Sequence, residues 1–338
     1  MSTKSGTTWT VYDANTMTQA EIYGQVLCDL GAANPKIVGL SADLAKSTKI
    51  GMFGDKFPDR FFNVGIAEQN MFGVAAGLAR SGLLPFVSTM AAFVTMRAGE
   101  QVRTDICYQN LDVKIIATHG GTSFGAAGST HHCTEDLAIT RAFPNMTVIV
   151  PADGIETSNA IKACVDWPGP VYIRIGRGFE PTYYQDENYG FQIGKAVELN
   201  PGTDITIICC GITVLQAMEA AKILKESDGL SVRVLNMHTI KPIDEEAILK
   251  AVVETRRIIT FEDHNVLGGL GSAVADVVAK SGKGCAFDKV GIPDCFCVVG
   301  YPEDLYSHYG LDSNSIIDKV REVMGKDFEE DESWEDEV

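Results

Sequence analysis

Short apolar runs alternate with amphipathic helical patterns along almost the whole chain of 338 residues, and few folds accommodate that alternation. An apolar run bounded by turn residues is typical of a buried strand, whereas apolar residues three and four positions apart are typical of a helix. Strands that alternate with helices form parallel sheets whose faces the helices cover. The sequence therefore predicts an α/β protein built on parallel sheets.

The predicted elements follow one another in a regular order. A first helix is expected to begin after Thr18, because Thr18 and Glu21 have the spacing of a capping box. The apolar runs predict strands at residues 37–40, 61–64, 85–87, 113–117, 148–150, 171–175, 205–209, 232–235, 257–261 and 296–299. The helical patterns predict helices near residues 67–78, 91–108, 134–142, 154–166, 217–225, 245–253, 272–279 and 313–324.

The alternation stops between residues 181 and 201, where the composition, rich in proline, tyrosine, glycine and acidic residues, is typical of a linker. This linker separates two predicted domains, residues 15–180 and the smaller 202–326. Two domains agree with a typical size of about 150 residues per domain. Eight of the twelve residues from 327 to 338 are acidic, so this end is expected to be a solvated acidic tail.

The net charge and the apolar pattern exclude two classes of function, nucleic-acid binding and membrane insertion. A net charge of −17 argues against a nucleic-acid partner, since binding to the phosphate backbone depends on clustered lysine and arginine. Neither a signal peptide nor an apolar stretch of roughly 18 residues is visible, so we expect no membrane insertion.

Nine irregularly spaced cysteines predict a reducing, cytoplasmic compartment and no metal site. Small core residues are expected at Cys209, Cys210, Cys295 and Cys297.

Glu68 is the most conspicuous carboxylate in the sequence, because it begins a helix made mostly of small apolar residues. One interpretation is structural: its charge stabilises the helix N-terminus. The other is functional: a poorly hydrated carboxylic acid would act as a proton donor near neutral pH. The local sequence alone leaves both interpretations open.

Residues 119–132 form a glycine-rich loop that contains His119, His131 and His132 and follows the predicted strand at 113–117. Ligand sites in open parallel sheets lie beyond the carboxyl ends of the strands. A loop of this composition has little use in packing, so we interpret it as part of a polar site.

A second glycine motif, Gly269-Leu270-Gly271, lies between a predicted strand and a predicted helix. The dinucleotide-binding fingerprint requires Gly or Ala at its third position, where this chain has Val274. A lone pair of glycines at such a turn is typical of close backbone packing, so we do not expect a nucleotide site there.

Five segments in register resemble the transketolase family, which includes 1-deoxyxylulose-5-phosphate synthase: residues 65–71, 88–93, 128–131, 144–146 and 176–178. The resemblance extends over roughly residues 18–325 and covers only the family's pyrimidine-binding and C-terminal domains. The Gly-Asp-Gly motif that binds thiamine diphosphate and Mg²⁺ in the family is not found in this sequence. The resemblance therefore implies the C-terminal subunit of a two-chain transketolase, in which an N-terminal partner subunit carries that motif and holds the Mg²⁺.

The same resemblance implies an activity and an assembly. A transketolase of pentose phosphate metabolism transfers a two-carbon ketol unit from a ketose, usually phosphorylated, to an aldose or aldose phosphate. Each active site needs both domain types, which implies an α2β2 heterotetramer. Three alternatives stay open: the β subunit of a 2-oxo acid dehydrogenase, half of a 1-deoxyxylulose-5-phosphate synthase, and a binding or regulatory protein that retains the fold.

The resemblance also assigns cofactor-binding roles. Glu68 matches the glutamate that protonates N1′ of the cofactor's aminopyrimidine, which makes it a catalytic residue. Phe93 matches an aromatic residue that stacks on the pyrimidine ring. Met90 and Met96 stand where the family often has aromatics, so they are expected to pack on the cofactor by thioether contact.

Substrate-binding roles follow in the same way. His119 and His131 match histidines that contact phosphorylated sugars or assist proton transfer, and we expect His131 to be catalytic. Arg177 and Ser47, together with Asp43, match loops on the substrate side, and Arg177 would bind a phosphate.

Two positions depart from full-length transketolases. Ala127 replaces an aspartate that contacts the substrate, and Gly120 replaces another aspartate, so the resemblance does not predict the sugar. The role of His264, in a loop that resembles subunit contacts, stays open.

Overall fold

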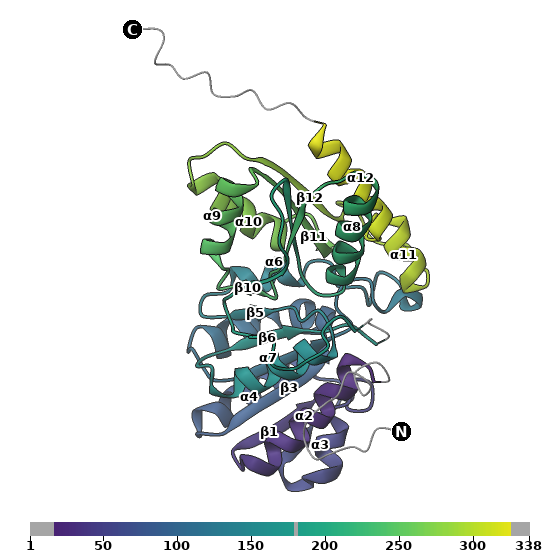
Figure 1. The fold of residues 1–338 in the computed structure, drawn as a ribbon. Coiled ribbons are helices and arrows are strands. Elements are labelled where there is room, and N and C mark those ends of the chain that lie inside the picture. The colour runs from purple at the N-terminus through teal and green to yellow at the C-terminus, as the bar shows by residue number, and fades with distance from the viewer. Residues whose placement is uncertain (1–16, 179–181, 326–338) are drawn as a thin grey trace.

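The computed structural model describes residues 17–178 and 182–325, and the predicted acidic tail lies outside these residues. Two sheets form the framework, and helices lie against both of them (Figure 1). The predicted α/β class is confirmed. None of the helices in the described ranges combines the length and apolar character needed to cross a bilayer.

The first sheet has seven strands in the order β10-β5-β6-β4-β3-β1-β2. All neighbouring strands are parallel except β10, which pairs antiparallel with β5. Its strands are β1 (Ile37–Ser41), β2 (Phe61–Asn63), β3 (Leu84–Met90), β4 (Lys114–Thr118), β5 (Thr147–Ile149), β6 (Val171–Arg174) and β10 (Thr239–Lys241). The central strands β1, β3, β4 and β6 are wholly buried, which explains their continuous apolar runs.

Helical segments connect these strands. They are α2 (Gln19–Ala33), α3 (Gly51–Lys56), η1 (Pro58–Arg60), α4 (Glu68–Arg80), η2 (Phe93–Arg97), α5 (Gly99–Gln101), η3 (Val102–Cys107), η4 (Gly125–Ala127), α6 (Asp136–Ala142) and α7 (Gly154–Asp166). The capping box of Thr18 and Glu21 is present at the start of α2. The single helix predicted at 91–108 is wrong in detail: η2 and η3 are wider π-helical turns on either side of the short α5.

The second sheet has five strands in the order β12-β11-β8-β9-β7. Its elements are β7 (Val197–Asn200), β8 (Ile205–Cys209), α8 (Thr213–Ser227), β9 (Val232–Asn236), α9 (Glu245–Glu254), β11 (Arg257–Asn265), α10 (Leu270–Lys280), β12 (Ala286–Ile292), α11 (Pro302–His308) and α12 (Ser313–Met324). Aspartate side chains cap α9 and α12 by accepting a backbone N–H in the first turn.

Further differences from the sequence prediction concern a strand in the linker, the last strand and one cysteine. The range predicted as a linker contains β7, which pairs antiparallel with β9. No strand forms at 296–299, where Phe296 is 81% exposed; β12 at Ala286–Ile292 is the strand, and its mixed polar sequence concealed it. Cys295 is exposed, so its assignment to the core is wrong, whereas Cys209, Cys210 and Cys297 are buried as predicted.

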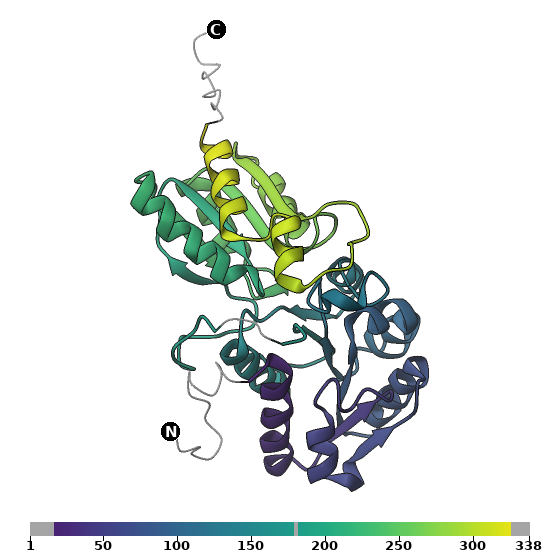
Figure 2. The same cartoon turned by 90° about the vertical axis from the view of Figure 1, so that its right-hand side faces the viewer.

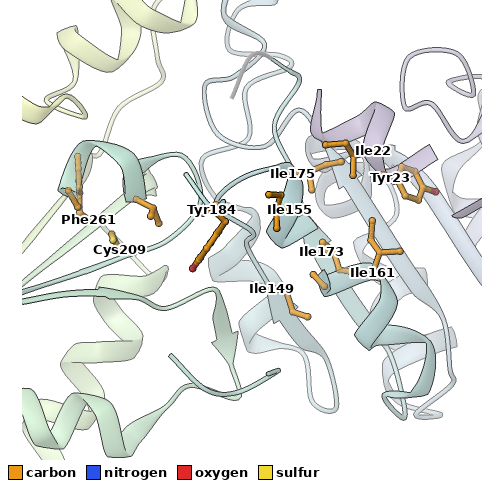
Figure 3. Packing of buried hydrophobic residues seen from close by; sticks show 14 of the residues in the cluster. Ile22, Tyr23, Ile149, Ile155, Ile161, Ile173, Ile175, Tyr184, Cys209 and Phe261 are labelled. Carbon is orange, nitrogen blue, oxygen red and sulfur yellow. The ribbon is translucent and has the colours of Figure 1, made fainter. Parts of the chain in front are cut away.

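Two apolar clusters of buried residues each include residues of both sheets. Figure 3 shows side chains of the first sheet and its helices, such as Ile173 and Ile22, in the same cluster as Cys209 and Phe261 of the second sheet. The loop after β12 reaches back to the first sheet (Figure 2), where Ser129 Oγ donates a hydrogen bond to the carbonyl of Cys297 over 2.6 Å. Strand β10 adds a further link, because it comes from the second half of the sequence and joins the first sheet.

Candidate active site

The predicted site residues follow the carboxyl ends of neighbouring strands. Strands β1, β3 and β4 are parallel neighbours in the first sheet, and β6 pairs parallel with β4. The segments that follow them carry Ser47, Phe93, His119 and Arg177. Since the carboxyl ends of parallel strands meet at one edge, the four segments share the edge at which open α/β sheets bind ligands.

Glu68 is the first residue of α4, and only 4% of it is exposed. Arg97 Nη1 donates a hydrogen bond to Glu68 Oε1 over 2.9 Å. The guanidinium carbon of Arg97 also lies 3.6 Å from the ring centroid of Phe93. The three side chains therefore form one cluster, in which a single arginine contacts both groups that the sequence assigns to the cofactor.

A series of ring contacts continues from Phe93 into the glycine-rich loop. The centroids of Phe93 and His131 are 5.6 Å apart, and those of Phe124 and His131 are 5.5 Å apart. Phe124 also contacts His119, with centroids 4.6 Å apart, and the guanidinium carbon of Arg177 lies 4.8 Å from the Phe124 centroid. His119, His131 and Arg177 thus contact Phe124, and Phe93 joins them through His131.

Sequence reasoning missed Phe124 and Arg97. Phe124 is an apolar residue within a loop that stood out for its glycines and histidines. Arg97 is four residues from Phe93 in the sequence. Only the structure shows that both lie in the π-helical turn η2 and that the guanidinium of Arg97 lies over the ring of Phe93. A flat aromatic side chain in a glycine-rich loop was the available signal for Phe124, whereas the sequence held no comparable signal for Arg97.

His119 is held in an unusual position. Its backbone has a φ of 60°, its ring is 2% exposed, and its Nδ1 lies 2.7 Å from Thr118 Oγ1. Burial lowers the pKa of His119 to about 4, and the nearby charges of Arg177 and His131 act in the same direction. His119 is therefore a neutral imidazole at physiological pH, suited to hydrogen bonding rather than to ion pairing.

His132 differs from the other two histidines of the loop. It is buried, and its Nε2 lies 2.9 Å from the carbonyl oxygen of Gly125. That contact fixes the shape of the loop around η4. Of the three histidines that suggested a polar site, the structure therefore joins His119 and His131 to the ring contacts and gives His132 a structural role.

The loop is anchored from the second sheet. The backbone N–H of Thr122 lies 3.2 Å from both carboxylate oxygens of Asp263, and Thr122 Oγ1 donates to Asp263 Oδ1 over 3.1 Å. A Cβ at Gly121 would lie 1.9 Å from Asp263 Oδ2, and the φ of Gly121 is +58°. A side chain at this position would therefore displace either the loop or the carboxylate of Asp263.

The other predicted residues lie at the margins of this cluster. Met90 is buried at the end of β3, whereas Met96 is 57% exposed on η2. Ser47 and Asp43 are exposed in the turn that follows β1, and the backbone N–H of Asp43 donates to Asn63 Oδ1 over 2.9 Å. These four residues lie near the same sheet edge, outside the series of ring contacts that connects Phe93 with the glycine-rich loop.

The Gly269-Leu270-Gly271 turn is a packing feature, as predicted. The carboxylate of Glu262 accepts the backbone N–H groups of Leu270 and Gly271 over 2.6 and 2.7 Å. It thereby occupies the N-terminus of α10, where a pyrophosphate would otherwise bind. His264 is buried beside it, with Nδ1 2.7 Å from the carbonyl oxygen of Asn265.

Comparison with known families covers both halves of the chain. Residues 15–179 match the pyrimidine-binding domain of transketolase, and residues 194–316 match the transketolase C-terminal domain. The chain belongs to the transketolase family. The resemblance seen in the sequence is confirmed, and this transketolase chain has both domains in the expected order.

Individual relatives have nearly the same length as this transketolase chain. A protein of Methanocaldococcus jannaschii, provisionally named a transketolase C-terminal section, is 45% identical over 306 residues, or 90% of this chain and 96% of that protein. One of the subunits of an apulose-4-phosphate transketolase from Phocaeicola vulgatus is 40% identical over 90% of this chain and 96% of its own length. These similarities identify the chain as a C-terminal subunit of a split transketolase.

A solved structure agrees with this identification. It is described as a split-gene transketolase in an inactive β4 tetramer, and it is 44% identical with a TM-score of 0.82 over 91% of this chain and 98% of that chain. A more distant relative, 1-deoxy-D-xylulose-5-phosphate synthase of Halothermothrix orenii, is 36% identical over 92% of this chain but only 49% of that enzyme. Both the split arrangement and the relationship to the synthase predicted from the sequence are confirmed.

Proposed function

We propose that this transketolase subunit supplies the pyrimidine-binding half of a thiamine diphosphate site and that Glu68 is the residue that holds the proton there. The observation that carries the proposal is the buried carboxylate of Glu68 at the first turn of α4, joined through Arg97 to the ring of Phe93. A ring for stacking beside a buried carboxyl group fits an aminopyrimidine, which has a flat face and a basic ring nitrogen.

Within this site the roles divide by chemistry. When bound, thiamine diphosphate supplies the carbon nucleophile that carries a two-carbon ketol unit between sugars. Glu68 would hold a proton at N1′ of the pyrimidine, because its carboxyl group is buried at the start of α4 and lines the pocket there. Phe93 orients the pyrimidine by stacking. Met90 and Met96 lie on either side of Phe93 in the sequence, and in this proposal their thioethers would pack on the bound cofactor.

The glycine-rich loop and the segment after β6 form the substrate side. Arg177 is exposed and stacked on Phe124, so it can bind an anionic group such as a sugar phosphate by charge-assisted hydrogen bonds. His119 is neutral and donates to or accepts from a sugar hydroxyl, and His131, between the Phe93 and Phe124 rings, assists proton transfer. Ser47, exposed after β1, completes the substrate side.

The diphosphate and the Mg²⁺ belong to a partner chain in this proposal. Among residues 17–178 and 182–325, no group of three or more His, Cys, Asp or Glu side chains is arranged to hold a metal ion. An N-terminal subunit with the Gly-Asp-Gly motif supplies that half, and an α2β2 assembly provides both halves to each site. The β4 tetramer of the similar split-gene transketolase is described as inactive, which supports the requirement for a second chain.

The proposed cellular compartment is based on the cysteine side chains. All nine cysteines are free, and most are buried, which supports a reducing, cytoplasmic compartment. Sugar phosphates of pentose phosphate metabolism are the substrates that such a location and Arg177 favour. Among relatives, the apulose-4-phosphate transketolase has a phosphorylated ketose in its name, which supports the same substrate class.

The decisive experiment isolates the chain with its partner. We expect an N-terminal subunit to co-purify from native cells, and the complex to contain thiamine diphosphate and Mg²⁺ and to transfer two carbons between sugar phosphates. Activity that instead needs a lipoyl carrier protein would identify a 2-oxo acid dehydrogenase, and condensation of pyruvate with an aldose phosphate would identify the synthase reaction. A complex that binds no cofactor would contradict the proposal and leave a binding or regulatory role.

A further inference from the structure

Arg97 makes the two contacts that the proposed function reserves for the pyrimidine. Its guanidinium carbon lies 3.6 Å from the Phe93 centroid, which is stacking distance, and its Nη1 is 2.9 Å from Glu68 Oε1. The guanidinium is itself a flat group with N–H donors along its edge. It therefore resembles an aminopyrimidine in the two respects that matter here: it stacks on an aromatic ring and it pairs with a carboxylate.

The two groups exclude each other. Phe93 is 9% exposed, and its ring contacts His131 edge-on with centroids 5.6 Å apart. A guanidinium in contact with the face of the ring leaves no space for a second flat group on that face, because both require the same separation from the ring. Glu68 Oε1 is likewise already in use. On this face of Phe93, a pyrimidine can stack and also pair with Glu68 Oε1 only after Arg97 has moved away.

The structure allows Arg97 to move. Its side chain is 47% exposed, and it lies at the last position of the π-helical turn η2, so a change of rotamer moves the guanidinium into solvent. An ion pair with one exposed partner is weak. The pocket at this point has a volume of about 510 Å³ and is lined by Arg97, Glu68 and the segment Ile66–Asn70.

We propose that Arg97 is a displaceable cover of the pyrimidine site, closed in the free subunit and open when the pyrimidine is bound. The inference rests on the proposed function, since it identifies the occupant that Arg97 replaces. Departure of Arg97 also frees Glu68 Oε1, the oxygen that now accepts from Arg97 Nη1, to pair with N1′ of the pyrimidine.

The cover lowers the apparent affinity for the cofactor. A ligand that binds only the open state has its affinity reduced by the fraction of molecules that are open. A stacked, partly exposed ion pair of this kind corresponds to a closed state favoured by about tenfold. Removal of the guanidinium should therefore tighten cofactor binding by about tenfold, and the difference should shrink at high salt, because salt screens the ion pair.

The test uses the complex of the full chain with its partner subunit, Mg²⁺ in excess and thiamine diphosphate as the probe, measured by equilibrium dialysis. Arg97→Ala and Arg97→Gln are compared with the unchanged complex at low and high salt. Arg103→Ala is the matched control, because Arg103 is an exposed arginine on the neighbouring η3 and its loss removes the same charge. Circular dichroism verifies that each variant is folded.

We expect the dissociation constant to fall about tenfold in both Arg97 variants at low salt, to fall less at high salt, and to stay unchanged in Arg103→Ala. Weaker or unchanged binding in the Arg97 variants would overturn the inference and leave the proposed function intact. An unchanged complex that binds no thiamine diphosphate at all would instead refute the proposed function, so the two failures are distinguishable.

Discussion

At the scale of single residues, the proposed function depends most on Glu68, the residue proposed to hold the proton at the cofactor's pyrimidine. It begins α4 and is almost fully buried, and its place beside Phe93 makes a proton-holding role chemically reasonable. We expect Glu68→Gln or Glu68→Ala to lower the turnover rate of the complex by about 10²–10⁴-fold, the usual scale for an acid–base group. Steady-state kinetics of the reconstituted complex measures this loss.

The matched control is Glu100→Gln, since Glu100 is an exposed glutamate that pairs with its neighbour Gln101. It should leave the rate within about twofold, as is usual for a surface substitution. Full activity of the Glu68 variants would show that the carboxylate only stabilises the start of α4, the structural interpretation that the sequence left open.

His238 gives a prediction on pH and stability. Its ring is buried and stacked on Phe191, with centroids 4.4 Å apart, and burial lowers the pKa of His238 to about 4. In the unfolded chain a histidine titrates near pH 6.5, so the unfolded state binds more protons between about pH 6.5 and 4. The stability contribution of the neutral ring is therefore present above about pH 6.5 and is lost as the pH falls toward 4.

A His238→Phe variant removes this titration and keeps a flat ring for Phe191. Between pH 7 and about pH 4.5, the unchanged chain should lose about 1–3 kcal/mol more unfolding free energy than the variant does. Urea denaturation at stepped pH values measures the difference, and comparison of the two proteins cancels other groups such as Asp153. Parallel pH profiles would show that His238 is not buried as a neutral ring.

At the scale of elements, the loop at 119–132 depends on its anchor to Asp263. We expect Gly121→Ala to push this loop away from the carboxylate, because its Cβ would lie 1.9 Å from Asp263 Oδ2. The KM for the sugar substrate should rise by about tenfold or more, because His119 and His131 of the displaced loop no longer lie where the substrate binds. Thiamine diphosphate affinity should change little, since Glu68 and Phe93 belong to other segments.

Gly82→Ala is the matched control for that experiment. Gly82 has a φ of +85°, so alanine meets the same kind of backbone strain, but nothing lies within 4 Å of the added Cβ. It should lower stability by about 1 kcal/mol without a change in KM. An equal rise of KM in both variants would indicate general destabilisation rather than displacement of the loop.

At the scale of the whole molecule, Arg174 joins the two sheets. It lies at the end of β6, and its Nη2 donates to the backbone carbonyl of Asp263 in β11 over 2.6 Å. Its Nε is 3.0 Å from Asp136 Oδ2, which also accepts the hydroxyl of Tyr172 over 2.7 Å. Removal of this buried cation leaves the buried carboxylate of Asp136 uncompensated.

We expect Arg174→Met to lower the unfolding free energy by about 3–5 kcal/mol, the usual effect of breaking a buried ion pair. Arg80→Ala should change it by less than about 0.5 kcal/mol, because Arg80 is exposed and bonds to exposed Gln109. Urea denaturation compares the two variants with the unchanged chain. A small loss in Arg174→Met would show that the shared apolar clusters and the other links between the sheets, such as Asp263 with Thr122, hold them together without Arg174.

The assignment of Glu68, Phe93, His119 and Arg177 to one site rested on the family resemblance and stays a prediction. The sequence alone determined the α/β class, the start of α2 at its capping box and most of the buried strands. These features depend on local patterns: an apolar run or a cap three residues from its partner. The strand at 286–292 escaped detection because its side chains are mixed and half-buried, which removes the apolar signal.

Only the tertiary structure decided the contacts between distant segments. Strand β10 leaves the second half of the chain to complete the first sheet, and Asp263 reaches Thr122 across 141 residues of sequence. Arg97 meets Glu68 across 29 residues, and Arg177, from the segment after β6, lies over the ring of Phe124 in the glycine-rich loop. Such contacts depend on how the elements pack and turn in space, and a pattern within one segment of sequence carries no record of its distant partner.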